Sequence, residues 1–355
     1  MHIKIYGTPT SGNKMIKSFM GDILFRAKIP FKISEVQDIT RFLEKNIESI
    51  PAIQLDEEPI VALKTNGSFN KSLRSAINHI LSKENYGQLS KLIVPVDFKD
   101  ASINAVSYAH RLATELGAVT KVVHVHDPGN ESRDLKADNN SAIESKERLH
   151  NLVKSIDHDW GSDILKASFI SSDFRVGTIA KGILQSSKEN SAELIIMGSC
   201  ISDNKNTRRH KSKSLEIIAN ANCSTLIVPP KAHYKGLSKV LLALDSDKIT
   251  QSIIDVLKNI FLGLKSEIHI LQSQNNLDFE VNLNLISKGI PELNIKSAVQ
   301  KTENYITDIG DYAAENNIDI IALSPPSNTQ FSSMLKRMTQ RAIHINKAIP
   351  IMLLK

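Results

Sequence analysis

The segments LIVPVD at residues 92–97 and VLLALD at residues 240–245 decide the fold, because they show one strand pattern twice, 148 residues apart. Each segment is a short apolar run that ends in aspartate, which is typical of a strand buried in a parallel sheet. Two later pairs repeat at an offset of 126 residues: ELIIMG at 193–198 with DIIALS at 319–324, and CSTLIV at 223–228 with IPIMLL at 349–354. The chain therefore contains one fold twice, and the difference between the offsets makes the second copy 22 residues shorter.

Strand and helix patterns alternate through the first copy, which indicates a parallel sheet with helices on both faces. We predict its strands at residues 92–96, 121–126, 164–170, 194–197 and 225–228. We predict its helices at residues 101–116, 141–156, 176–188 and 214–220. The first copy corresponds to a domain at residues 90–232, and the second copy to a domain at residues 236–355.

Residues 1–85 have a shorter pattern and form a third domain. Strands are expected at residues 2–7, 31–36, 51–55 and 60–63, and helices at residues 13–27, 41–47 and 69–81. The order βαβαββα is that of a small independent unit, and the polar run at residues 82–90 is its natural linker.

The composition is typical of a cytoplasmic protein. No apolar run approaches the roughly 18 to 20 residues of a membrane-spanning helix, and the chain begins as a strand instead of a signal peptide. The two cysteines, Cys200 and Cys223, fit a reducing compartment and are too few for a disulfide framework. We therefore expect no membrane association.

The net charge of +6 is modest, and nucleic-acid binding would need that excess on one face. Basic residues gather at residues 204–213, a segment without apolar periodicity that we interpret as a solvated loop. Nucleic acid is therefore not an expected partner.

No constellation for catalysis is apparent, so we predict that the protein is not an enzyme. The eleven histidines show no metal-binding spacing, and His124 with His126 on one strand lacks a third ligand. Cys200 has no adjacent histidine to lower the pKa of its thiol, and we interpret it as inert, with a redox or metal-sensing thiol as the alternative.

The two copies resemble the universal stress protein family. The likeness lies in VPVD at 94–97, HVHDP at 124–128, IIMGS at 195–199 and NCSTLIV at 222–228, and it spans about three quarters of the chain. The resemblance implies two doubly wound, Rossmann-like domains that pack through their final strands as an internal pseudo-dimer. Whether whole chains also form a homodimer stays open.

Members of this family include ATP binders and proteins that bind no nucleotide, and a loop after the fourth strand separates them. In the binders this loop is rich in glycine, and the pattern gives Gly198, Ile201, Lys211 and Ser212 here. Side chains at two of the glycine positions hinder close approach of the backbone to a phosphate, so the usual triphosphate cradle is not expected.

Asp97 and Val125 match the family's adenosine-contacting positions, and each also has a structural interpretation. Asp97 could cap the following helix, Val125 could be core, and Ser212 could be an N-cap ahead of Leu215. The cationic segment could instead hold an anion by charge.

The second copy departs further from the binding pattern. Its loop positions are Ser324, Ser327, Arg337 and Met338, and only Asp245 persists. Nucleotide binding by the second copy is therefore not expected.

Residues 1–85 resemble the thioredoxin and glutaredoxin family. Ser11 and Lys14 replace both cysteines of its C-x-x-C motif, SIPAI at 49–53 matches its cis-proline segment, and GSFNKSL at 67–73 matches the turn before its last helix. Dithiol exchange needs a thiolate, so this domain cannot perform it. The resemblance implies that it docks an extended peptide of a protein partner.

The sequence thus predicts an α/β protein, with a thioredoxin-like unit followed by two doubly wound parallel-sheet domains. The predicted function is that of a non-catalytic, universal-stress-type binding or scaffold protein that requires no cofactor. One alternative is an ATP-binding switch, whose adenine nucleotide is held by Asp97, Val125, Gly198 and Ser212. The other is a module that binds an apolar or anionic metabolite in the same cleft.

Overall fold

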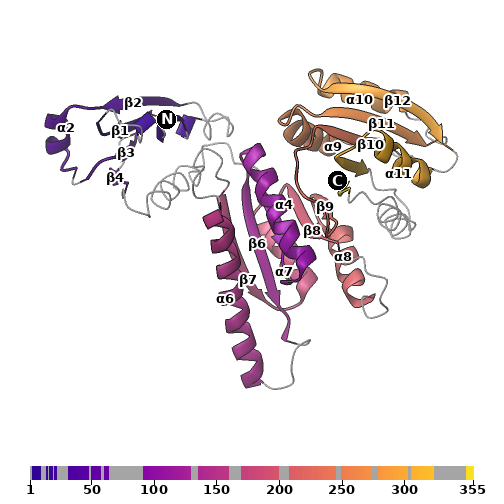
Figure 1. Ribbon diagram of the computed structural model, residues 1–355, viewed down its shortest axis with the longest axis horizontal. Helices are drawn as coiled ribbons and strands as arrows, with labels where there is room; N and C mark the ends of the chain where they lie inside the picture. The colour runs from indigo at the N-terminus through magenta and orange to yellow at the C-terminus, as the bar shows by residue number, and fades with distance from the viewer. Residues whose placement is uncertain are drawn as a thin grey trace. The chain divides into compact units, whose positions relative to one another are not determined.

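The computed structural model divides into two compact units, which are described separately (Figure 1). The first comprises Met1–Ser90 with Gly117–Val119 and Ser155–Phe169, and the second comprises the rest of the chain. The structure describes residues 2–8, 13–14, 16–18, 20–21, 31–47, 49–56, 60–63, 91–128, 135–159, 169–199, 208–244, 249–273, 279–302, 305–323 and 349–355.

The N-terminal unit contains a four-stranded sheet in the order β2-β1-β3-β4. Its central strand β1 (His2–Tyr6) pairs in parallel with β2 (Lys32–Val36) and antiparallel with β3 (Ala52–Leu55). The edge strand β4 (Val61–Ala62) pairs antiparallel with β3. All four strands lie within the predicted ranges, and the peptide bond between Ile50 and Pro51 is cis.

Helix α2 (Ile39–Glu44) begins two residues before its predicted start and also ends earlier. It begins early because the carboxylate of Asp38 accepts a hydrogen bond of 3.0 Å from the backbone N–H of Thr40. It ends early because Asn46 turns into the left-handed region, with φ 52°. The helix predicted at residues 69–81 and the linker at 82–90 lie outside the described residues.

A single ten-stranded sheet runs through residues 91–355, in the order β12-β11-β10-β13-β14-β9-β8-β5-β6-β7. The strands are β5 (Lys91–Pro95), β6 (Val119–His126), β7 (Phe169–Val176), β8 (Leu194–Gly198), β9 (Ser224–Val228), β10 (Lys239–Leu244), β11 (Glu267–Ser273), β12 (Asn294–Thr302), β13 (Ile320–Leu323) and β14 (Ile351–Leu353). Read outward from the centre, each half has its fifth, fourth, first, second and third strand. This order is that of a doubly wound sheet, in which the chain leaves the first strand in both directions.

Helices connect the strands of each half. The first half has α4 (Asp100–Leu116), α6 (Leu135–Asp159), α7 (Ile179–Glu189) and α8 (Arg208–Asn220). The second half has α9 (Gln251–Val256), the π-helical turn η3 (Leu257–Leu262), α10 (Phe279–Gly289) and α11 (Tyr305–Glu315). Helix α4 packs on β5 and β8 because its buried residues recur at helical spacing, at Ala105, Val106, Ala109, Leu112 and Ala113.

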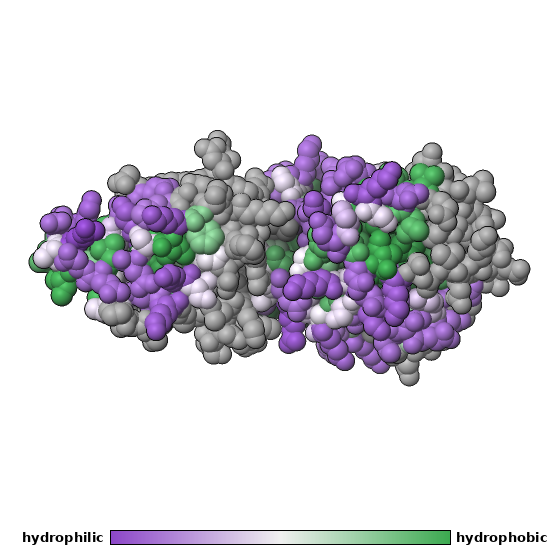
Figure 2. All heavy atoms as spheres, turned by 90° about the horizontal axis from the view of Figure 1, so that it is seen from above, coloured by the Kyte–Doolittle hydropathy of each residue, from purple (hydrophilic) through white to green (hydrophobic). Residues whose placement is uncertain are grey.

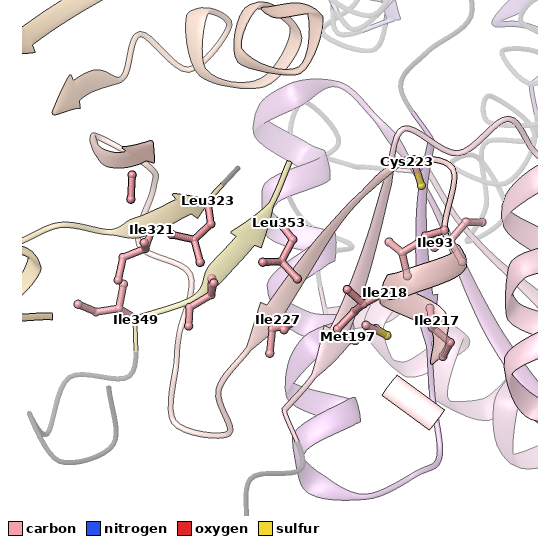
Figure 3. Packing of buried hydrophobic residues seen from close by; sticks show 14 of the residues in the cluster. Ile93, Met197, Ile217, Ile218, Cys223, Ile227, Ile321, Leu323, Ile349 and Leu353 are labelled. Atoms are coloured by element: carbon pink, nitrogen blue, oxygen red, sulfur yellow. The ribbon is translucent and has the colours of Figure 1, made fainter. Parts of the chain in front are cut away.

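The two halves meet through their final strands, β9 and β14, which are the antiparallel pair at the centre of the sheet. Met352 lies opposite Leu226, and both side chains are fully buried. One hydrophobic cluster crosses this junction, with Ile227 from the first half and Ile321 and Leu353 from the second (Figure 3). The pairing is the one that the family resemblance implied.

The connection from β9 to β10 is fixed along α4. The side-chain amide of Asn104 donates hydrogen bonds to the backbone carbonyls of Pro229 (3.1 Å) and Ala232 (2.9 Å). The hydroxyl of Tyr234 donates to the carboxylate of Glu115 at 2.6 Å. These contacts anchor the segment between the two halves to the first half.

The third strand of the first half extends further along the chain than the sequence predicted. Strand β7 occupies Phe169–Val176 and overlaps the predicted range 164–170 only at residues 169 and 170, and α7 begins at Ile179 instead of residue 176. The hydrophobic pattern did not reveal residues 171–176 as strand because β7 is the edge of the sheet and carries polar residues. Its Arg175 forms ion pairs with Asp173 and with Glu189 of α7.

Most of the coloured surface in Figure 2 is hydrophilic, with smaller hydrophobic areas between the hydrophilic ones. Large exposed apolar side chains include Ile39 and Leu43 on α2, and Val281 and Leu285 on α10. Among the described residues, no helix has the length and apolar character needed to cross a membrane.

Replacing Leu353 with alanine tests whether the shared cluster holds the two halves together. Leu353 is 2% exposed, so the substitution leaves a cavity and should lower the free energy of unfolding by about 2–5 kcal/mol. The measurement is urea denaturation followed by circular dichroism. Leu285→Ala is the matched control. Because Leu285 is 38% exposed, this substitution should lower the free energy of unfolding by less than about 1 kcal/mol. Equal losses in the two variants would contradict a stabilising role for the junction.

Candidate functional site

A cavity of about 470 Å³ lies at the carboxyl ends of β5, β6 and β8. Residues at the start of α4 and on α7 and α8 complete its lining. Strand β5 lies between β8 and β6, so the connections from neighbouring strands diverge at this point. This is where open parallel sheets bind their ligands.

Three of the four predicted site residues line this cavity: Asp97 after β5, Val125 on β6, and Gly198 at the end of β8. The fourth, Ser212, lies within helix α8, and its side chain is outside the described residues. The next two residues, Lys213 and Ser214, line the cavity. Four elements that are far apart in the sequence therefore converge on one space.

Asp97 stabilises the turn that leads into α4. Its carboxylate accepts a hydrogen bond of 3.2 Å from the backbone N–H of Lys99 and lies 3.2 Å from the Lys99 ammonium. Burial by itself would raise the pKa of Asp97, but hydrogen bonds with Ser102 and Lys99 and the charge of Lys99 hold that pKa below its ordinary value. Asp97 is therefore an ionised acceptor, and 41% of its side chain is exposed.

Phe98 has a positive φ of 61°, which is rare for a bulky side chain. This conformation accompanies a stack with His124, whose ring centroid lies 4.5 Å away, and with the Arg148 guanidinium, 4.6 Å from the Phe98 centroid. The Nδ1 of His124 lies 2.8 Å from the carbonyl oxygen of Val96, and His124 itself lines the cavity. Sequence analysis did not single out Phe98, because backbone strain leaves no signal in residue type.

Val125 belongs to the apolar floor of the cavity, together with Ile183 and Met197. It is 6% exposed, and α7 crosses it so closely that a Cβ on Gly182 would lie 2.8 Å from its Cγ2. The interpretation of Val125 as core and its place in the cavity are thus compatible.

Gly198 is required by packing alone. A Cβ at this position would lie 2.3 Å from the carbonyl oxygen of Ala101, at the start of α4. The glycine therefore lets β8 approach α4, and this need exists whether or not a phosphate binds.

Helix α8 corrects two interpretations of the sequence. It begins at Arg208 instead of residue 214, so the basic residues 208–213 are helical and do not belong to a loop. Ser212 is consequently inside the helix, and its interpretation as an N-cap is wrong. Polar and basic residues hide this helical turn from a search for apolar periodicity.

Lys213 of α8 forms an ion pair with Asp127, which follows β6. The distance from Lys213 Nζ to Asp127 Oδ2 is 3.7 Å, and each side chain is 22% exposed. Both residues line the cavity. Sequence analysis did not single them out as site residues. Asp127 follows the second strand as Asp97 follows the first, which is a signal that could have been used.

Several predicted positions lie outside the described residues, including Cys200, Ile201, Asp245 and the second-copy loop at 324–338. Cys223 is buried, and burial raises the pKa of its thiol, which makes the reactive thiolate scarce. Among the described residues, no group of three or more potential ligands could hold a metal ion. The described cavity has an apolar floor and two Asp–Lys pairs at its polar side.

Known proteins with a similar sequence or structure have the fold described above for residues 91–355. Residues 89–229, which include the whole described cavity lining, match the model of the universal stress protein family. A universal stress protein from Archaeoglobus fulgidus DSM 4304 is 16% identical over 75% of this chain and 96% of its own, with a TM-score of 0.57. This likeness extends the fold beyond the family match to three quarters of the chain. No curated protein matches the chain.

Two further solved structures are similar. A putative universal stress protein from Pseudomonas aeruginosa UCBPP-PA14 is 12% identical over 75% of this chain and 93% of its own, with a TM-score of 0.42. A universal stress protein in complex with cAMP is 16% identical over 40% of this chain and 98% of its own, with a TM-score of 0.31.

Gly198→Ala tests the close approach of β8 to α4. The added methyl group meets backbone atoms that cannot rotate away, so we expect a loss of about 1–3 kcal/mol in the free energy of unfolding. Gly263→Ala is the control, because its Cβ would meet the nearest atom at 3.4 Å and its φ of −59° suits alanine, so stability should change by less than about 1 kcal/mol. A neutral Gly198→Ala would mean that the approach is looser than described.

Asp97→Asn tests the lowered pKa of this carboxyl. Because the folded-state pKa lies below the ordinary value of 3.8, the ionised carboxylate stabilises the fold above that pH, and the stabilisation is lost as pH falls through the folded pKa. The stability difference between wild type and Asp97→Asn should therefore be constant from about pH 5 to 7 and shrink below about pH 4. Urea denaturation across this range measures it, with Asp255→Asn on α9 as the control. A difference that grows on acidification would have the wrong sign.

Proposed function

We propose that this chain is a non-catalytic, universal-stress-type protein whose first copy binds a small ligand of the nucleoside class. The observation that supports the proposal is the cavity at the carboxyl ends of β5, β6 and β8, in which Asp97 and Val125 lie together. The match of residues 89–229 to the universal stress protein family is its premise.

The lining suits a nucleoside because it separates apolar from polar surface. Val125, Ile183 and Met197 offer an apolar floor against which a base can pack. Asp97 offers an ionised carboxylate that can accept hydrogen bonds from ribose hydroxyls. Asp97 and Val125 are also the positions that, by the family resemblance, contact adenosine.

A triphosphate is not needed for this proposal. Packing against Ala101 already accounts for Gly198, and Ile201 replaces the next glycine of the family pattern. ATP is therefore one candidate ligand among adenine nucleotides. In the proposed non-catalytic role, the protein requires no cofactor. Should no nucleoside bind, a scaffold that acts through protein partners is the competing function.

The proposal extends to the whole chain. We infer that residues 236–355 are a second, degenerate copy that supports the first, since the strand order of the two halves mirrors about β9 and β14. We also infer that residues 1–85 are a thioredoxin-like domain that docks a protein partner, since its parallel β1–β2 and antiparallel β1–β3 pairs suit that fold. Ser11 and Lys14 leave it without the dithiol.

Thermal unfolding of the full chain, with and without millimolar adenosine, AMP and Mg·ATP, tests the proposal. A ligand at 100 times its dissociation constant adds about 2.7 kcal/mol to the stability of the unit that binds it, which should raise its melting temperature by several degrees. Each transition has to be followed, because the units can melt separately.

The shift should be lost in Asp97→Ala and kept in Asp255→Ala, a carboxylate on α9 outside the cavity. Absence of any shift with all three ligands would reject nucleoside binding and favour the scaffold. A shift that survives in Asp97→Ala would place the ligand elsewhere.

A further inference from the structure

We propose that Lys213 binds an anionic group of the ligand, such as a phosphate, and that Asp127 holds the lysine in place until that group arrives. This inference rests on the proposed function and deepens it, because it names the ligand as a phosphorylated nucleoside. In this scheme a lysine on α8 replaces the glycine-rich cradle that the sequence lacks.

The position of Lys213 supports the proposal. It lines the same cavity as Asp97 and Val125, but it comes from a different element, α8. A ligand that packs on the apolar floor would therefore contact Lys213 with a different group from the one that contacts Asp97. Its side chain is 22% exposed, so the charge is partly withdrawn from water, where an anion is attracted more strongly than at an open surface.

The ion pair with Asp127 is suited to exchange. At 3.7 Å, Lys213 Nζ and Asp127 Oδ2 are further apart than the roughly 2.7–2.9 Å of a charge-assisted hydrogen bond. The two groups thus attract each other by charge without a direct hydrogen bond, and a phosphate with more negative charge and three acceptor oxygens can compete for the ammonium. In the protein without ligand, Asp127 neutralises the lysine and thereby avoids an uncompensated charge.

The other lysine among the described cavity residues is held differently. Lys99 lies 3.2 Å from Asp97, its backbone N–H also donates to that carboxylate, and its side chain is 56% exposed. Lys99 therefore serves the turn before α4 and stands nearer the solvent. Of the two, Lys213 is the one placed to recognise an anion.

The experiment compares dissociation constants of AMP and adenosine, measured by isothermal titration calorimetry on the full chain at fixed salt. Wild type should bind AMP more tightly than adenosine. Lys213→Gln should lower the ratio of AMP to adenosine affinity about tenfold or more, since hydrogen bonds to charged groups are worth that much. Lys213→Arg keeps the positive charge and should retain most of the ratio.

Asp127→Asn removes the competing carboxylate and should raise the AMP affinity about two- to fivefold relative to adenosine. A damaged cavity would bind AMP more weakly, so misfolding cannot explain a higher AMP affinity in Asp127→Asn. This variant therefore tests the proposal even if Lys213→Gln loses affinity because its structure is disturbed. Lys258→Gln is the matched control, because it makes the same charge change at an exposed position on η3 and should leave the ratio unchanged.

The outcomes separate the two proposals. If adenosine and AMP bind wild type equally, or if Lys213→Gln leaves their ratio unchanged, the role of Lys213 is rejected while nucleoside binding stands. If neither ligand binds wild type, both proposals fail. A ratio that falls in Lys213→Gln, is retained in Lys213→Arg and rises in Asp127→Asn supports the exchange.

Discussion

The antiparallel pairing of β9 with β14 is the constraint on which the rest of residues 91–355 depends. Each final strand would be a sheet edge in a half that stood alone, with unpaired backbone groups open to other chains. When the two strands pair, these backbone groups form hydrogen bonds with each other. Leu226 and Met352, which lie opposite each other in the pair, are fully buried. One hydrophobic cluster then extends across both halves, and the ammonium of Lys355 donates to the carbonyls of Ala219 and Ala221 at the end of α8.

The site is a consequence of how closely helices approach this sheet. Gly198 and Gly182 are positions where a methyl group would collide, with the Ala101 carbonyl and with Val125 respectively. These contacts fix α4 and α7 on either side of the strand ends, and the space left between the elements is the cavity. Gly198, the one glycine here that matches the family's phosphate motif, thus has a packing role first, and a binding role can be added to it.

Charge is arranged around the cavity as paired groups. Asp97 is matched by Lys99, and Asp127 by Lys213, so the site is close to neutral while it retains strong acceptors and donors. For the ligand proposed above, binding would exchange one ion pair for another instead of creating an isolated charge, which would limit the desolvation cost.

The sequence by itself determined the repeated βα pattern and the strands β5 and β8, which lead to Asp97 and Gly198, because buried apolar runs and their spacing are local signals. It did not determine the extent of the edge strand β7 or the first turns of α8, whose polar residues carry no such signal. Only the tertiary structure brought Lys213 to Asp127 and turned Phe98 onto His124, since contacts between distant elements depend on how helices cross the sheet. The family resemblance named Asp97 and Val125, but the packing around them decided what kind of cavity they line.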